Sequence, residues 1–109
     1  MYILGTEEIR ESEVGFKMLC CKQVEVSSGL PSKVSLQYID GKVILHKDPD
    51  SPKADYKNLW NGKGFGFGPN IPYKIKVPIK LMNKVGWSED DTLIIKGIDE
   101  DTASVEAEK

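Results

Sequence analysis

Residues 73–95 read YKIKVPIKLMNKVGWSEDDTLII, and this stretch decides the fold. Lysine and apolar residues alternate over 73–77, which is the two-residue period of a strand with one buried face. Pro78 suits the start of a short helix over 79–85, and Gly86 suits the position just after a helix ends. The apolar run 92–96 predicts another strand. We therefore expect a mainly β fold with one short helix.

A β-hairpin is predicted over residues 34–47. Asp40 and Gly41 lie between two β-rich runs, and this dipeptide favours a two-residue type I′ turn. Counting outward from the turn gives an apolar face and a mixed face, as a sheet packed on one side requires. The expected pairs are Tyr38 with Val43 and Leu36 with Leu45 on the apolar face, and Ser35 with His46 and Gln37 with Ile44 on the mixed face. His46 is expected to be a solvated strand residue without a catalytic role.

The rest of the chain divides into three regions by composition. Further strands are predicted over 2–4, 16–26 and 102–106, and one helical turn over 7–13. Residues 48–55 contain two prolines and no apolar period, so a boundary is expected there. The predicted organisation is a β-rich N-terminal region with a hairpin (1–50), a linker (51–62) and a second domain (63–109).

The residue inventory argues against an enzyme and against a metal or cofactor site. There is one histidine, and no G-x-S-x-G, P-loop or CxxC pattern occurs. Cys20 and Cys21 are adjacent, so they are expected to be reduced thiols on opposite faces of a strand. No apolar run approaches the roughly 18 residues of a membrane helix, and the N-terminus does not resemble a signal peptide. A cytoplasmic protein without membrane contact is expected.

Charge is distributed unevenly along the chain. The net charge of the whole is −2, but residues 51–86 carry seven lysines against one acid, a net charge of +6. Residues 87–109 carry two lysines against eight acids, a net charge of −6. A basic block of this kind indicates an anionic partner. The alternative is that the acidic segment pairs with the basic block inside the fold or a dimer.

Three segments of the C-terminal half resemble the AbrB/MazE-type swapped-hairpin family. They are Lys76-Val77-Pro78-Ile79-Lys80-Leu81, Lys84-Val85-Gly86-Trp87 and Glu89-Asp90-Asp91-Thr92-Leu93-Ile94-Ile95. They follow the family's succession of strand, proline, short helix, glycine and acidic turn before a hairpin. The likeness covers residues 63–108, under half of the chain.

This resemblance implies an obligate homodimer whose hairpins interlock into one barrel, and a DNA-binding transcription regulator or antitoxin-like protein. By position, Lys74, Lys80 and Lys84 would contact duplex DNA, with Lys63 and Lys76 in the same basic block. Two departures bear on recognition. Met82 and Asn83 stand where the family favours arginines, and Asp90 replaces the glycine of the acidic turn. Because lysine lacks the bidentate fork of arginine, contacts to phosphates are expected rather than readout of guanine.

Two other functions are open at this point. Lys63-Gly64-Phe65-Gly66-Phe67 resembles the first RNA-binding motif of the cold-shock domain, which implies a single-stranded nucleic-acid binder with Phe65 and Phe67 stacked on bases. The second motif of that family is missing, and the two phenylalanines could instead pack in a core or against a protein. The other alternative is a small protein-binding inhibitor or adaptor that recognises its partner through residues 1–50.

Overall fold

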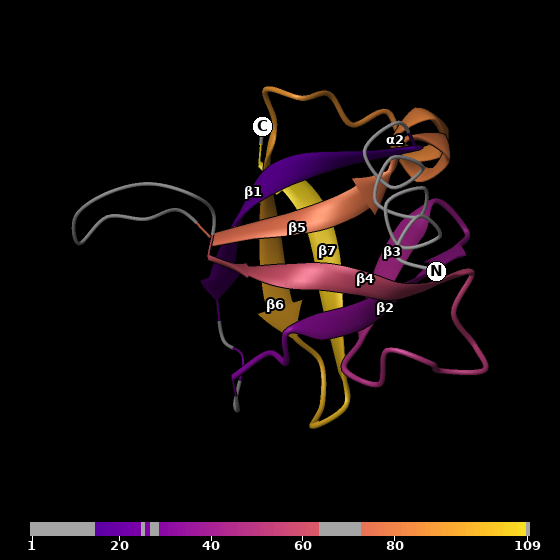
Figure 1. Cartoon of the computed structure of the whole chain (residues 1–109), viewed down its shortest axis with the longest axis vertical. Coiled ribbons are helices and arrows are strands. Elements are labelled where there is room, and N and C mark those ends of the chain that lie inside the picture. The colour runs from indigo at the N-terminus through magenta and orange to yellow at the C-terminus, as the bar shows by residue number, and fades with distance from the viewer. Residues whose placement is uncertain (1–14, 25, 27–28, 64–72, 109) are drawn as a thin grey trace, which may run out of the picture.

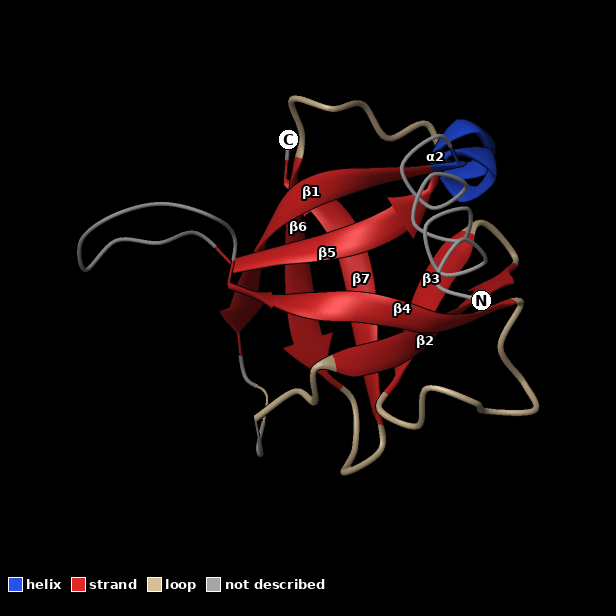
Figure 2. Ribbon diagram, viewed as in Figure 1, coloured by secondary structure: helices blue, strands red, loops and turns tan. Residues whose placement is uncertain are grey.

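A computed structural model describes residues 15–24, 26, 29–63 and 73–108 of the chain. Seven strands form one closed barrel in the order β1-β5-β4-β2-β3-β7-β6 (Figures 1 and 2). The elements are β1 (Phe16–Val24), β2 (Lys33–Ile39), β3 (Lys42–His46), β4 (Tyr56–Lys63), β5 (Tyr73–Pro78), α2 (Ile79–Val85), β6 (Thr92–Gly97) and β7 (Thr102–Glu108). The expected mainly β fold with one short helix is confirmed. The strand expected over 2–4 and the helical turn over 7–13 lie outside the described residues.

The barrel closes through strand β1, which lies between two strands of the C-terminal half. β1 pairs antiparallel with β5, with Leu19 opposite Ile75, and parallel with β6, with Cys21 opposite Leu93. A second cross-connection pairs β3 with β7. Strands from both sides of the expected boundary at 51–62 therefore share one sheet and one core.

The hairpin of β2 and β3 has the predicted register. All four expected residue pairs are present, so the position of the turn is confirmed. Asp40 and Gly41 have φ values of 50° and 78°, as a type I′ turn requires at both central residues. The expectation that the His46 side chain is solvated is wrong, because the residue is only 8% exposed. Its Nε2 lies 2.9 Å from Gln37 Oε1, on the outer face of the hairpin, and this hydrogen bond satisfies one buried ring nitrogen.

The linker expected over 51–62 is wrong for its second half, which forms strand β4. Asn58 has a φ of 56°, and the pairing of β4 with β2 shifts register between Val34 and Leu36. Such a bulge breaks the two-residue alternation by which a strand is detected in a sequence. Beyond it, Leu59 and Asn61 both face the interior, with 2% and 1% exposure.

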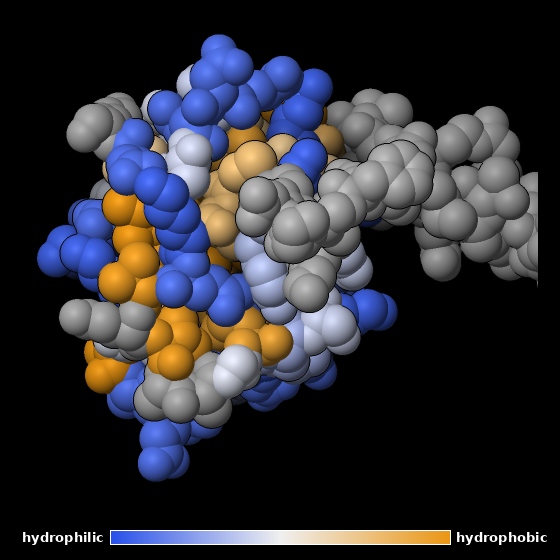
Figure 3. All heavy atoms as spheres, turned by 90° about the vertical axis from the view of Figure 1, so that its left-hand side faces the viewer, coloured by the Kyte–Doolittle hydropathy of each residue, from blue (hydrophilic) through white to orange (hydrophobic). Residues whose placement is uncertain are grey.

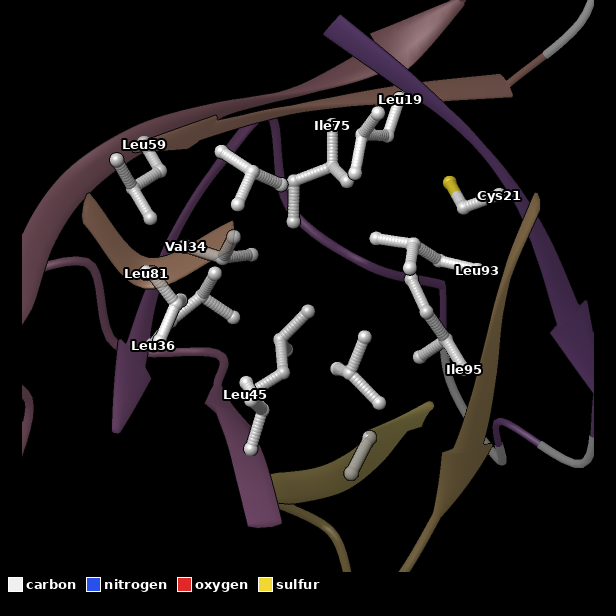
Figure 4. Packing of buried hydrophobic residues seen from close by; sticks show 14 of the residues in the cluster. Leu19, Cys21, Val34, Leu36, Leu45, Leu59, Ile75, Leu81, Leu93 and Ile95 are labelled. Carbon is white, nitrogen blue, oxygen red and sulfur yellow. The ribbon is translucent and has the colours of Figure 1, made fainter. Parts of the chain in front are cut away.

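The core fills the barrel with side chains from every strand. Leu19, Leu36, Leu45, Ile75 and Ile95 are fully buried, and Figure 4 shows them converging on the interior. α2 lies at one end of the barrel, as Figure 1 shows, and its Leu81 points inward toward Leu36 (Figure 4). Leu81 is fully buried and Met82 is 5% exposed, so the helix contributes to the same core as the strands.

The C-terminus of α2 depends on Gly86, whose φ is 75°. Its backbone N–H donates to Met82 O, and the N–H of Trp87 donates to the same oxygen at 3.0 Å. The predicted end of the helix is therefore confirmed. A β-branched residue is strained at this φ, whereas asparagine tolerates it.

Gly86→Val is expected to lower the free energy of unfolding by about 1 kcal/mol or more, because valine disfavours positive φ. Gly86→Asn is the matched control and should cost clearly less. Urea unfolding of the two variants measures the difference. Equal stability of Gly86→Val and the parent protein would contradict the left-handed conformation at this position.

Candidate nucleic-acid interface

Two lysines of β5 point outward from the barrel wall. Ile75 and Val77 are fully buried, so the alternation of the strand turns Lys74 and Lys76 to the opposite, outer face. Two residues along a strand correspond to about 6.6 Å, which sets the spacing of these lysines along the wall. We call Lys74 and Lys76, with the outward residues Phe16 and Trp60 on the strands at either side, the basic wall.

Phe16 lies beside Lys76 on the β1 side of the basic wall. The Nζ of Lys76 is 5.8 Å from the centre of the Phe16 ring, which is within cation–π range. Met18 is the cross-strand partner of Lys76 and is 39% exposed. The lysine is therefore bordered by apolar side chains, and no carboxylate competes for it from β1.

Trp60 forms a flat aromatic surface on the β4 side of the basic wall. A Cβ atom at Gly62 would lie 3.1 Å from Cζ2 of the Trp60 indole, so the ring lies over Gly62. Gly62 is the cross-strand partner of Lys74, which places the indole next to that lysine. On the side of β4 that faces away from β5, the cross-strand partner of Trp60 is the exposed Lys33 of β2.

Among the described residues, the acidic C-terminal segment does not neutralise the basic wall. Three of its eight carboxylates pair with other lysines: Glu89 with Lys17 at 2.8 Å, Glu108 with Lys22 at 2.9 Å and Glu106 with Lys96 at 3.7 Å. In the basic block 51–86, the described ion pair is that of Lys57 with Asp50. Lys74 and Lys76 thus have no carboxylate partner within the described part of the chain.

The helix lysines form a second set at the end of the barrel. Lys80 and Lys84 are exposed and lie four residues apart, on one side of α2. Lys84 Nζ is 5.5 Å from the centre of the Tyr38 ring, which directs it toward the end of β2. Barrel order separates β2 from β5 by one strand, so the structure places this set beside the basic wall rather than within it.

Three predicted site residues cannot be added to either set. Lys63 ends β4 and pairs with Tyr73, and its side chain is outside the described residues, as are Phe65 and Phe67. Conversely, the sequence did not single out Lys33 or Phe16 as site residues. Lys33 precedes the basic block and Phe16 begins a strand, and only the cross-strand register brings them to the wall.

The two cysteines face opposite sides of β1, as predicted. Cys20 is exposed beside Lys74, and Cys21 is 7% exposed in the core. Burial, with a smaller contribution from the neighbouring Cys20, raises the pKa of the Cys21 thiol to about 12. Exposed Met18 and Val24 also lie on β1, and Figure 3 shows hydrophobic residues among hydrophilic ones on one side of the barrel.

Cys20 is expected to react with Ellman's reagent in the native protein at pH 8, and Cys21 only after unfolding. The thiolate is the reactive species, and the core both excludes the reagent and keeps Cys21 protonated. Cys20→Ser should remove the fast reaction, while Cys21→Ser should leave it in place. Release of two thiol equivalents at one fast rate from the folded parent would contradict this arrangement.

Comparisons with protein-family profiles, with curated proteins and with solved structures find no match to this chain. No helix within the described ranges is long and apolar enough to cross a membrane. The same ranges contain no group of three or more His, Cys, Asp or Glu side chains placed to hold a metal ion.

Proposed function

We propose that this protein binds nucleic acid, with duplex DNA as the ligand and its phosphates contacted by the lysines of β5 and α2. The observation that carries the proposal is the set of Lys74, Lys76, Lys80 and Lys84, which have no carboxylate partner among the described residues although the chain is acidic overall. Lysines left unpaired in this way are available to replace the counterions of a phosphate backbone.

The geometry favours contact with the backbone over readout of bases. The lysines of the basic wall lie on a strand of a closed barrel, and those of α2 on a helix of seven residues. Each lysine is a point charge, so it positions a phosphate without distinguishing a sequence. The resemblance to the swapped-hairpin family supports duplex DNA and a role as a transcription regulator or antitoxin-like protein.

Single-stranded nucleic acid is the second candidate, and the position of Trp60 favours it. Its indole lies over Gly62 and beside Lys74, so a base could stack on the ring while its phosphate meets the lysine. Stacking of a base on an aromatic side chain contributes about 1–3 kcal/mol. Phe65 and Phe67 of the cold-shock-like segment follow directly after β4.

The homodimer implied by the family resemblance is part of the proposal, but its physical basis changes. The resemblance implies that hairpins from two chains interlock into one barrel. Here a single chain closes a barrel of seven strands, four of which (β1 to β4) begin before residue 63. A dimer would therefore join two closed barrels through their outer surfaces, and it would double the lysines available to one duplex.

Salt dependence of duplex binding tests the lysine contacts. Four phosphate contacts per chain predict a log–log slope of affinity against salt of about −3.6 for a monomer, and twice that for a dimer. Lys74→Ala should flatten the slope by about 0.9 for a monomer or about 1.8 for a dimer, with little change in sequence preference. Lys53→Ala, at an exposed loop lysine, is the matched control. An unchanged slope in Lys74→Ala would sink the proposal.

The choice between the two ligands depends on Trp60. If single strands are bound, Trp60→Leu should weaken binding of an oligothymidine by about tenfold or more, since one stacked base contributes about 1–3 kcal/mol. If duplex DNA is the ligand, the same variant should bind a duplex nearly as the parent does, and Lys74→Ala should have the larger effect. Fluorescence anisotropy with both probes at one salt concentration separates these outcomes.

A further inference from the structure

Strands β3 and β7 part from one another near the end of the barrel that carries α2. Their pairing ends at Val43 opposite Val105, although β3 begins one residue earlier and β7 continues to Glu108. Over 106–108, β7 remains paired with β6 on its other side. Residues 106–108 of β7 thus form a short stretch whose edge toward β3 lacks a ladder partner within the described residues.

A groove of about 460 Å³ occupies the place where the two strands part. Val43, Val105 and Ala107 line it from the strands, and Val85 and Trp87 from the end of α2. Val85, Trp87 and Ala107 are only partly buried, so they offer apolar surface to a ligand. The volume lies in the range of ordinary ligand sites, so the groove can admit a side chain of an incoming segment.

The backbone of β7 supplies hydrogen-bonding groups along this groove. In a strand, the N–H and C=O groups of successive residues point to alternate sides. Within 106–108 at least one residue therefore directs both groups toward the groove, where the described backbone offers no ladder partner. An unpaired edge of this kind is a template for an added strand.

The charged residues that line the groove are Lys42 and Glu106. Lys42 is exposed and forms no ion pair with any described residue. Glu106 is the acid at the rim of the groove, and Lys96 pairs with it at 3.7 Å. An incoming carboxylate thus meets Lys42, whose charge no described carboxylate neutralises, while the charge of Glu106 is shared with Lys96.

We propose that this groove binds an extended acidic segment of a partner protein, which adds a short strand to the free edge of β7. Its backbone pairs with residues 106–108, one apolar side chain enters the groove against Val85 and Trp87, and a flanking carboxylate meets Lys42. Main-chain pairing supplies affinity in such strand addition, and the pocket supplies selectivity. The proposal does not rest on nucleic-acid binding, because neither Lys42 nor the β7 edge is among the residues proposed to contact duplex DNA.

The test uses a fluorescein-labelled heptapeptide in which glutamate alternates with valine around one central leucine. Saturable binding to the full-length protein is expected. A peptide with lysine in place of glutamate, and one with alternate backbone nitrogens methylated, should each bind at least about tenfold more weakly, a loss of about 1.4 kcal/mol. Methylation removes the donors that strand addition needs.

Two variants locate the binding site. Lys42→Glu reverses the rim charge at an exposed position, and Ala107→Leu fills the groove near the end of the chain. Each should weaken peptide binding at least about tenfold, a loss of about 1.4 kcal/mol. Lys53→Glu, in the loop before β4, should leave binding unchanged. Thermal unfolding checks that the variants fold. If Ala107→Leu does not fold, Lys42→Glu alone still tests the binding site.

Several results would overturn the proposal. Absence of saturable binding would do so, as would equal binding of the methylated peptide or indifference to Lys42→Glu. Sedimentation could give one further contradicting result. If the parent protein is a dimer and Ala107→Leu abolishes that dimer, the groove binds a second copy of this chain instead.

Discussion

The insertion of β1 between β5 and β6 is the constraint on which the rest of the structure depends. Leu19 and Cys21 enter the core from this strand, and its pairing with β6 closes the barrel. The same register fixes the outer surface, since it sets Phe16 and Met18 against Lys76 and Cys20 opposite Lys74. Packing inside and charge placement outside thus have one structural cause.

That arrangement gives some lysines of the chain a carboxylate partner and leaves others without one among the described residues. Three of the eight acidic residues after α2 form ion pairs with lysines of β1 and β6, as Glu108 does with Lys22. Exposed pairs of this kind contribute little to stability. Their effect is electrostatic instead, because carboxylates held there are not available to Lys74 and Lys76. A chain with a net charge of −2 can in this way present a basic wall.

Local sequence patterns predicted local structure well, but they did not predict which strands distant in the sequence pair with one another. The turn at Asp40 and Gly41 and the helix end at Gly86 followed from backbone preferences that act within a few residues. Strand β4 was missed because the bulge at Asn58 disrupts its alternation. Likewise, no local signal indicates that β1 pairs with β5 or that β2 pairs with β4, so Phe16 and Lys33 could not be assigned to a site with Lys74.

Chemical-shift mapping with a short duplex DNA tests the central claim most directly, because it reports the bound surface residue by residue. In a ¹⁵N-labelled sample, the largest shifts are predicted for backbone amides of the basic wall and its register partners, including Lys74, Lys76, Gly62 and Cys20. Amides around the turn after β6, such as Glu100, should stay unchanged. Shifts confined to that turn or to β7, with the basic wall unaffected, would contradict the account.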